Sequence, residues 1–151
     1  MADEYVFWED ISIGDISAFG SYTVTREEII EFATKYDPQP FHLSDEAAEA
    51  MHFGALCASG WHTCAMFMSM MVKEIGDKKG GLGSPGMDKL RWKRPVFVGD
   101  VLSVKSEITD KSLHPKRPNL GIVSFKNEVL NQDGTVVMSF IGDVMQMRAP
   151  Q

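Results

Sequence analysis

Residues 53–72, FGALCASGWHTCAMFMSMMV, contain no Asp, Glu, Lys or Arg. A run of this length is long enough to cross a membrane as a helix. However, the charges on its two flanks show no topological bias, and polar or small residues interrupt it. The interrupting residues are Ser59, Gly60, His62, Thr63 and Ser69. A helix that is apolar on all sides and does not span a membrane belongs in a protein core. We therefore predict a buried helix from residue 60 to about residue 75, capped by Gly76.

The chain before this helix predicts two shorter helices. Thr25 and Glu28 have capping-box spacing at the start of an apolar-periodic segment. That helix must end at Asp37, because Pro38 disfavours a helical conformation in the residue before it. Ser44 then begins the segment SDEAAEAM, whose acidic residues suit the first turn of a second short helix.

The second half of the chain alternates apolar and polar residues with a period of two, which is typical of β-strands. Turn signals separate these segments. The predicted strands, including an early one, lie within residues 16–24, 87–92, 101–108, 121–130 and 135–147. Successive strands joined by hairpins form an antiparallel sheet, and the buried helix must pack on it. We therefore predict an α+β fold with a single domain over residues 1–151.

Composition and charge limit the function classes. With 44% hydrophobic and 24% charged residues, the chain of 151 residues is typical of a globular domain with one core. Its formal net charge of −6 argues against nucleic acid as a partner, since phosphate backbones require clustered Lys and Arg. The acidic start MADEYVFWED does not resemble a secretory signal. Cys57 and Cys64 are predicted to be free thiols in a reducing compartment, so we expect a cytoplasmic protein without membrane association.

The segment YDPQPFH, residues 36–42, lies between the two short predicted helices. Its two prolines fix two φ angles and remove two backbone donors, so the segment is stiff. Asp37 and His42 converge only if the segment curls. A stiff loop that holds a carboxylate and an imidazole is suited to proton transfer. From the residues alone, the favoured interpretation is a proline-rich helix connection in which Asp37 is a terminal polar residue and His42 caps backbone groups.

Three motifs resemble those of one family, the MaoC-like dehydratases or R-specific enoyl-CoA hydratases. DPQPFH resembles the family's Asp-x-Asn-Pro-x-His motif. FGALCASGWHT resembles its Phe-Gly … Ala-His-Gly segment, which leads into a long central helix, and RWKRPVFVGD resembles its Pro-Val-x-x-Gly-Asp strand connection. The matches run in the family's order from about residue 25 to the C-terminus. The resemblance implies the hot-dog fold, in which a curved antiparallel sheet wraps round one long helix.

The resemblance also implies roles for five residues. Asp37 and His42 match the catalytic pair, and Gly60 matches the glycine of the oxyanion site. From its position alone, Gly60 would simply allow tight entry into the helix. Gln39 stands where the family usually has Asn, and Ser59 where many members have His. We expect both at the substrate site, with Gln39 either fixing the loop or touching substrate.

The implied activity is the reversible addition of water to a trans-2-enoyl thioester of CoA or acyl-carrier protein, which gives the R-3-hydroxyacyl thioester. Family members usually dimerise and bind acyl thioesters in a tunnel at the subunit interface, so we expect a homodimer or larger homo-oligomer. Two alternatives are a hot-dog acyl-CoA thioesterase and a subunit that binds acyl thioesters without catalysis. No cofactor is expected, and no common zinc spacing is present among His52, His62, Cys57 and Cys64.

Four methionines surround Phe67 in the predicted central helix. Because Met adapts to chain shape, these side chains can line an acyl tunnel, but filling the core is the commoner use. By count along the helix, Met68 lies near the position where some hydratases place a serine in the site. The four residues are Met66, Met68, Met70 and Met71.

Overall fold

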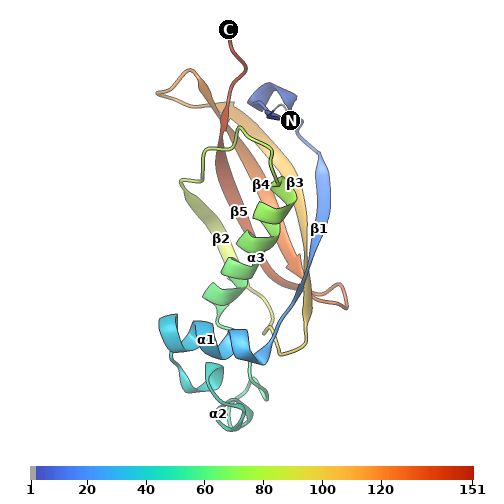
Figure 1. Cartoon of the computed structure of the whole chain (residues 1–151), viewed down its shortest axis with the longest axis vertical. Coiled ribbons are helices and arrows are strands. Elements are labelled where there is room, and N and C mark those ends of the chain that lie inside the picture. The colour runs from blue at the N-terminus through green and yellow to red at the C-terminus, as the bar shows by residue number, and fades with distance from the viewer. Residues whose placement is uncertain (1–2) are drawn as a thin grey trace.

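A five-stranded antiparallel sheet and one long helix form the centre of the molecule (Figure 1). The computed structural model describes residues 3–151. The strands lie in the order β1-β3-β4-β5-β2. They are β1 (Ile16–Thr23), β2 (Gly86–Trp92), β3 (Val101–Leu113), β4 (Leu120–Leu130) and β5 (Val136–Met147). The α-helices are α1 (Arg26–Tyr36), α2 (Asp45–Glu49) and α3 (Gly60–Ile75), and the short 3-10 helices are η1 (Trp8–Asp10) and η2 (Pro40–His42).

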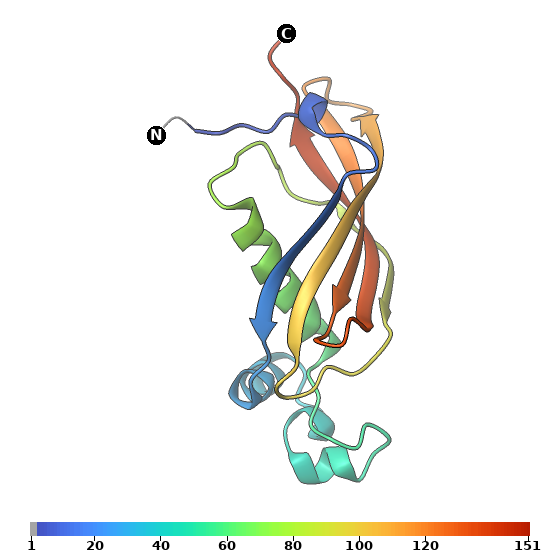
Figure 2. The ribbon, with the colours of Figure 1, turned by 90° about the vertical axis from the view of Figure 1, so that its right-hand side faces the viewer.

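Helix α3 packs along one face of the curved sheet (Figure 2). Its sheet-facing residues Met66, Phe67 and Met70 are 1%, 5% and 4% exposed. The helix ends at Ile75, and Gly76 follows with a φ of 58°, a left-handed conformation that favours glycine. The predicted bounds of the central helix are therefore confirmed. No helix within residues 3–151 is both long and apolar enough to cross a membrane.

The inner face of the sheet is built from alternating apolar residues on the long strands. Leu102 and Val104 on β3 and Val129 on β4 are buried in one core cluster with the side chains of α3. An antiparallel sheet that curves round one long helix is the hot-dog fold. The predicted α+β class and the predicted architecture are both confirmed.

The short helices α1, η2 and α2 lie beyond the N-terminal end of α3, at the opposite end of the molecule from the C-terminus (Figures 1 and 2). The Thr25 hydroxyl accepts a hydrogen bond from the Glu28 N–H at 3.2 Å, and the Ser44 hydroxyl accepts one from the Ala47 N–H at 3.2 Å. Both predicted N-caps are thus confirmed. The Glu28 carboxylate accepts from the Tyr22 hydroxyl of β1 and so ties α1 to the sheet.

Candidate active site

The segment between α1 and α2 curls back on itself. Asp37 is the C-cap of α1, and its N–H donates to the Ala33 carbonyl at 2.9 Å. Further along, the His42 N–H donates to the Gln39 carbonyl at 2.9 Å and closes the single turn of η2. Pro40 occupies the first position of this turn, where its fixed φ is already suited and its missing N–H has no role. The turn brings the His42 ring back to Asp37, so the two side chains do converge.

Asp37 and His42 form a close and largely buried pair. His42 Nε2 lies 3.4 Å from Asp37 Oδ2, and the side chains of His42 and Asp37 are 8% and 18% exposed. The other ring nitrogen of His42, Nδ1, lies 2.7 Å from the Cys57 carbonyl oxygen. Because a carbonyl oxygen only accepts, Nδ1 carries a proton. In neutral His42, Nε2 is therefore the unprotonated nitrogen, and it faces the carboxylate.

Gln39 and Ser59 complete the surroundings of Asp37. Gln39 Nε2 donates to Asp37 Oδ1 at 2.7 Å, so this amide fixes the loop. The buried Ser59 hydroxyl makes no hydrogen bond of ordinary length to residues 3–151, but it lies near enough to Asp37 to favour the ionised carboxylate. Burial alone would raise the pKa of Asp37, but the Ser59 hydroxyl, the Gln39 amide and His42 together lower it below its ordinary value. Asp37 is thus a carboxylate at neutral pH.

Gly60 begins α3 and lies against the indole ring of Trp92. A Cβ atom at position 60 would lie 2.5 Å from this ring, so the contact requires glycine. The N–H groups of Gly60 and Trp61 have no backbone acceptor within the described chain, as is usual in the first turn of a helix. The close packing on β2 is a reason for glycine that sequence analysis did not identify, because the indole comes from a strand distant in sequence.

A cavity of about 480 Å³ lies between His42 and the start of α3. Its lining includes His42, Gly60, Thr63, Trp92 and Val96. His42 and Gly60, the first residue of α3, therefore border one space, whereas Asp37 and Trp61 are not part of its lining.

A second cavity, of about 490 Å³, begins one turn further along α3, at Cys64. It lies between α3 and the inner face of β4 and β5, and most of its lining is apolar. Met68 and Met71 line this cavity, whereas Met66 and Met70 are buried in the core. Two of the four methionines thus fill the core and two line a cavity, while their use for an acyl chain stays a prediction.

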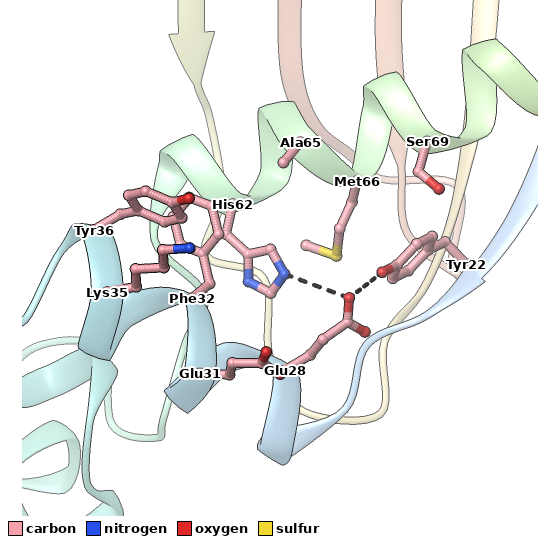
Figure 3. Close-up of a pocket in the computed structure, with 10 residues that line it drawn as sticks. All are labelled: Tyr22, Glu28, Glu31, Phe32, Lys35, Tyr36, His62, Ala65, Met66 and Ser69. Carbon is pink, nitrogen blue, oxygen red and sulfur yellow. Dashed lines mark hydrogen bonds and ion pairs between the residues drawn. The ribbon is translucent and has the colours of Figure 1, made fainter.

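A third cavity, of about 420 Å³, lies on the other side of α3, where this helix meets α1 and β1 (Figure 3). His62 Nε2 lies 4.0 Å from the Glu28 carboxylate, which also accepts from the Tyr22 hydroxyl. The His62 ring stacks on Phe32 at 4.7 Å. Burial lowers the pKa of His62 against an opposing effect of Glu28, and burial with the Glu28 contact raises the pKa of Tyr22 to about 12. At neutral pH the His62 ring and the Tyr22 phenol are therefore both uncharged.

The two cysteines border these cavities, Cys57 together with His52 at the first and Cys64 at the second. Cys57 and Cys64 are both free, and Cys57 precedes α3 in a segment that bridges to Phe97. Burial raises the pKa of each thiol. Within residues 3–151, no group of three or more His, Cys, Asp and Glu side chains is arranged to hold a metal ion.

Comparison with known proteins assigns the chain to a family. Residues 13–128 match the family described as MaoC like domain. The chain belongs to the MaoC-like dehydratase family. The resemblance inferred from the three motifs is therefore confirmed.

Several proteins are similar to this MaoC-like chain. YdeM of Bacillus subtilis (strain 168), an uncharacterized protein, is 30% identical over 82% of this chain and 86% of its own length. A 3-hydroxybutyryl-CoA dehydratase of Methylorubrum extorquens is 23% identical over 88% of this chain and 83% of its own. The crystal structure of a MaoC-like dehydratase from Rhodospirillum rubrum has a TM-score of 0.86 at 35% identity and covers 97% of this chain and 99% of that one.

The R-hydratase PhaJ1 from Pseudomonas aeruginosa shares the fold. Its structure has a TM-score of 0.75 at 24% identity and covers 95% of this chain and 86% of that one. An identity this low shows common architecture and does not by itself transfer an activity.

Proposed function

We propose that this protein is a hydratase/dehydratase that adds water reversibly to a trans-2-enoyl thioester of CoA or acyl-carrier protein and forms the R-3-hydroxyacyl thioester. The observation that carries the proposal is the Asp37–His42 pair, in which an ionised carboxylate lies 3.4 Å from Nε2 of an imidazole whose Nδ1 is held by the Cys57 carbonyl. The dehydratase named in Methylorubrum extorquens supports the reaction type. The R configuration rests on the resemblance to R-specific hydratases.

Asp37 Oδ2 and His42 Nε2 face one another in a way that suits the activation of one water molecule. A water can donate one hydrogen to Asp37 Oδ2 and the other to His42 Nε2, and its oxygen lone pairs then point away from both. When that oxygen attacks Cβ, one O–H bond breaks and its proton passes to the pair, with Asp37 as the principal base. The π electrons of the alkene form the new C–H bond at Cα with a proton from the pair. The hydrogen bond from Nδ1 to Cys57 keeps Nε2 in the accepting form.

The start of α3 suits the thioester oxygen, on which negative charge develops during the attack. The free N–H groups of Gly60 and Trp61 belong to the first turn, where the helix dipole also favours an anion. Preorganised donors of this kind are typically the largest electrostatic contribution to such reactions. We assign Gly60 and the neighbouring Ser59 to the oxyanion and substrate-binding part of the site. The reaction balances as one water added to one alkene, so these residues suffice without a cofactor.

We also propose that the protein forms a homodimer or a larger homo-oligomer. A second copy would supply another wall for the cavities beside α3, which are open to solvent in the single chain. The 3R-hydroxyacyl-ACP dehydratase HadBC of Mycobacterium tuberculosis, which shares the fold, is a complex.

The decisive experiment is incubation with trans-crotonyl-CoA. We expect loss of the enoyl absorbance and formation of R-3-hydroxybutyryl-CoA alone, resolved on a chiral column. Asp37→Asn and His42→Ala should each fold but lower kcat by about 100- to 10,000-fold. Their effects should not multiply in the double variant, because both residues serve one water.

Two variants provide matched controls for these substitutions. Asp133→Asn and His114→Ala change the same residue types in exposed or half-buried turns, so both should keep full activity. An S product, or full activity in Asp37→Asn, would contradict the proposal. Release of free CoA thiol without hydration would identify a thioesterase, and tight binding without reaction would identify a non-catalytic binding subunit.

A further inference from the structure

The inner face of the sheet carries one polar pair among apolar residues. The Ser106 hydroxyl of β3 donates to Asn127 Oδ1 of β4 at 2.7 Å. Ser106 and Asn127 are only 4% and 3% exposed, and their neighbours on the same faces, Val104 and Val129, are both buried in the core. A polar group in such a place is costly unless its hydrogen bonds are satisfied.

Other groups of the protein satisfy only part of the hydrogen-bonding capacity of Asn127. Asn127 has two acceptor lone pairs and two N–H donors, and Ser106 occupies Oδ1. Nδ2 makes no side-chain hydrogen bond to residues 3–151 and is not fully enclosed, because Asn127 lines the apolar cavity beside α3. Two N–H groups are therefore available to whatever occupies this cavity.

The neighbouring Gly142 leaves room beside these donors. It lies on β5 with an ordinary backbone conformation, so its φ does not require glycine. A Cβ atom there would lie 3.2 Å from the Phe140 ring and 3.8 Å from Asn127 Nδ2. The missing side chain thus keeps open the space next to the amide, and space is the structural reason for glycine at this position.

The donors lie well away from the catalytic pair. Asn127 pairs with Phe140 across the sheet, and the Phe140 ring contacts that of Phe67 on α3 at 4.9 Å between centroids. Phe67 is seven residues along α3 from Gly60, which corresponds to about 10 Å of helix. The cavities at Gly60 and at Asn127 share no lining residue, so a substrate whose thioester lies at Gly60 must extend past Cys64 to reach Asn127, several carbons along its acyl chain.

We propose that the preferred acyl chain carries an uncharged oxygen, either a hydroxyl or a carbonyl, several carbons from the thioester. This oxygen accepts a hydrogen bond from Asn127 Nδ2. The proposal rests on the proposed function. A purely hydrocarbon chain would displace water from Nδ2 and leave its N–H groups unpaired, which is unfavourable in a buried site. The oxygen is uncharged because the lysines of the cavity, Lys78 and Lys79, lie at its exposed rim, and Lys79 is paired with Asp3.

Binding of saturated thioesters tests this preference without any turnover. The probes are octanoyl-CoA and its 5-, 6-, 7- and 8-hydroxy derivatives, measured by isothermal titration calorimetry. At least one hydroxy derivative should bind about tenfold more tightly than octanoyl-CoA, the size expected for one hydrogen bond to a buried donor. Asn127→Asp keeps the side-chain shape but removes both donors, so the preference should disappear.

Two further variants test the preference even if the Asn127→Asp protein folds poorly. Gly142→Ala fills the space beside Nδ2 and should also reduce the preference. The control is Ser124→Ala, which removes the hydrogen bond to Asp143 at 2.6 Å on the other face of the same strands and should leave the preference unchanged. Octanoyl-CoA binding as tightly as all four derivatives would overturn the proposal, and so would equal loss of preference in Ser124→Ala.

Hydration of trans-2-octenoyl-CoA, followed separately, distinguishes the two proposals. Hydration without a preference for the hydroxy derivatives would overturn only the polar acyl chain. A preference without hydration would overturn the hydratase and leave the binding specificity standing. Failure of every thioester to bind would overturn both.

Discussion

At the scale of single residues, Gln39 holds the carboxylate of Asp37, the proposed base. Its amide donates to Asp37 Oδ1 and is one of the contacts that lower the pKa of Asp37. Gln39→Leu removes this donor, so the pKa of Asp37 should rise. Because the proposed base must be ionised, the acid limb of the pH–rate profile should then move to higher pH, so kcat should fall relative to the wild-type protein on the acid side and stay unchanged at neutral pH.

The conservative variant separates this positioning role from packing. Gln39→Asn keeps an amide and should retain most of the activity with a smaller shift of the acid limb. An unchanged profile in Gln39→Leu would show that the amide does not influence Asp37 in solution.

His62 makes the free energy of unfolding depend on pH. Burial lowers its pKa in the folded protein, whereas the unfolded chain has an ordinary value of about 6.5. The unfolded state therefore binds more protons as the pH falls through 6.5, and stability is lost on the acid side. One proton gives a slope of at most about 1.4 kcal/mol per pH unit in the free energy of unfolding.

His62→Phe should flatten this acid dependence, since a phenyl ring can keep the stacking on Phe32 without titrating. The measurement is urea unfolding at pH 7.5 and pH 5.5. His52→Gln replaces an exposed histidine and serves as the control, which should keep the slope of the wild-type protein. An equal slope in the wild-type and His62→Phe proteins would contradict the assignment.

The site residues that sequence could predict are those encoded locally. Asp37, Gln39 and His42 lie within six residues, and two prolines restrict the backbone between them. Asn127 also had a local signal that was overlooked, because it lies in phase with the predicted inward residues of its strand. Trp92 had no local signal in the sequence, since its position over Gly60 depends on how β2 and α3 pack at long range.

At the scale of secondary structure elements, local caps made the helix bounds predictable. Gly76 and Asp37 end their helices as predicted, since each stop signal acts through its own backbone or its neighbour's. The regular alternation expected for residues 87–92 is wrong. Lys89 has a φ of 53° and the register with β5 shifts between Asp88 and Arg91. Such an irregularity depends on the partner strand, which the sequence of one strand does not reveal.

The contact between α3 and β2 gives a prediction at this scale. Gly60→Ala places a Cβ atom 2.5 Å from the Trp92 ring, so the ring must move. We expect a loss of about 1–3 kcal/mol in the free energy of unfolding, as for overpacking elsewhere. In the Trp92→Ala background the same substitution should cost less, because the obstructing ring is gone.

Urea unfolding of the two single variants and the double variant measures this coupling. Strictly additive effects would show that Gly60 and Trp92 do not restrict one another. Turnover of crotonyl-CoA by the double variant then tests the other role of Gly60, because a defect that persists without the ring belongs to the oxyanion site.

At the scale of the whole molecule, one side of the structure is incompletely covered. β1 and β2 are the outer strands of the sheet, and exposed strand edges favour pairing with another chain. Large apolar side chains are exposed beside β2, on that strand and on α3. They are Trp61, Met68, Val72, Ile75, Met87 and Trp92. Several large apolar side chains exposed on neighbouring elements are characteristic of protein interfaces.

We therefore expect a dimer that joins these surfaces, with a mass near twice 16.8 kDa by light scattering at micromolar concentration. Val72→Glu places a carboxylate in the middle of the apolar surface, where burial without a partner is strongly unfavourable, so this variant should dissociate. Thr34→Glu adds the same charge to an exposed position on α1 and should remain dimeric.

A wild-type mass of 16.8 kDa would contradict the expected assembly, and dissociation of both variants alike would place the interface elsewhere. Since the cavities beside α3 would lose their second wall, Val72→Glu should also hydrate crotonyl-CoA more slowly at low protein concentration than at high concentration.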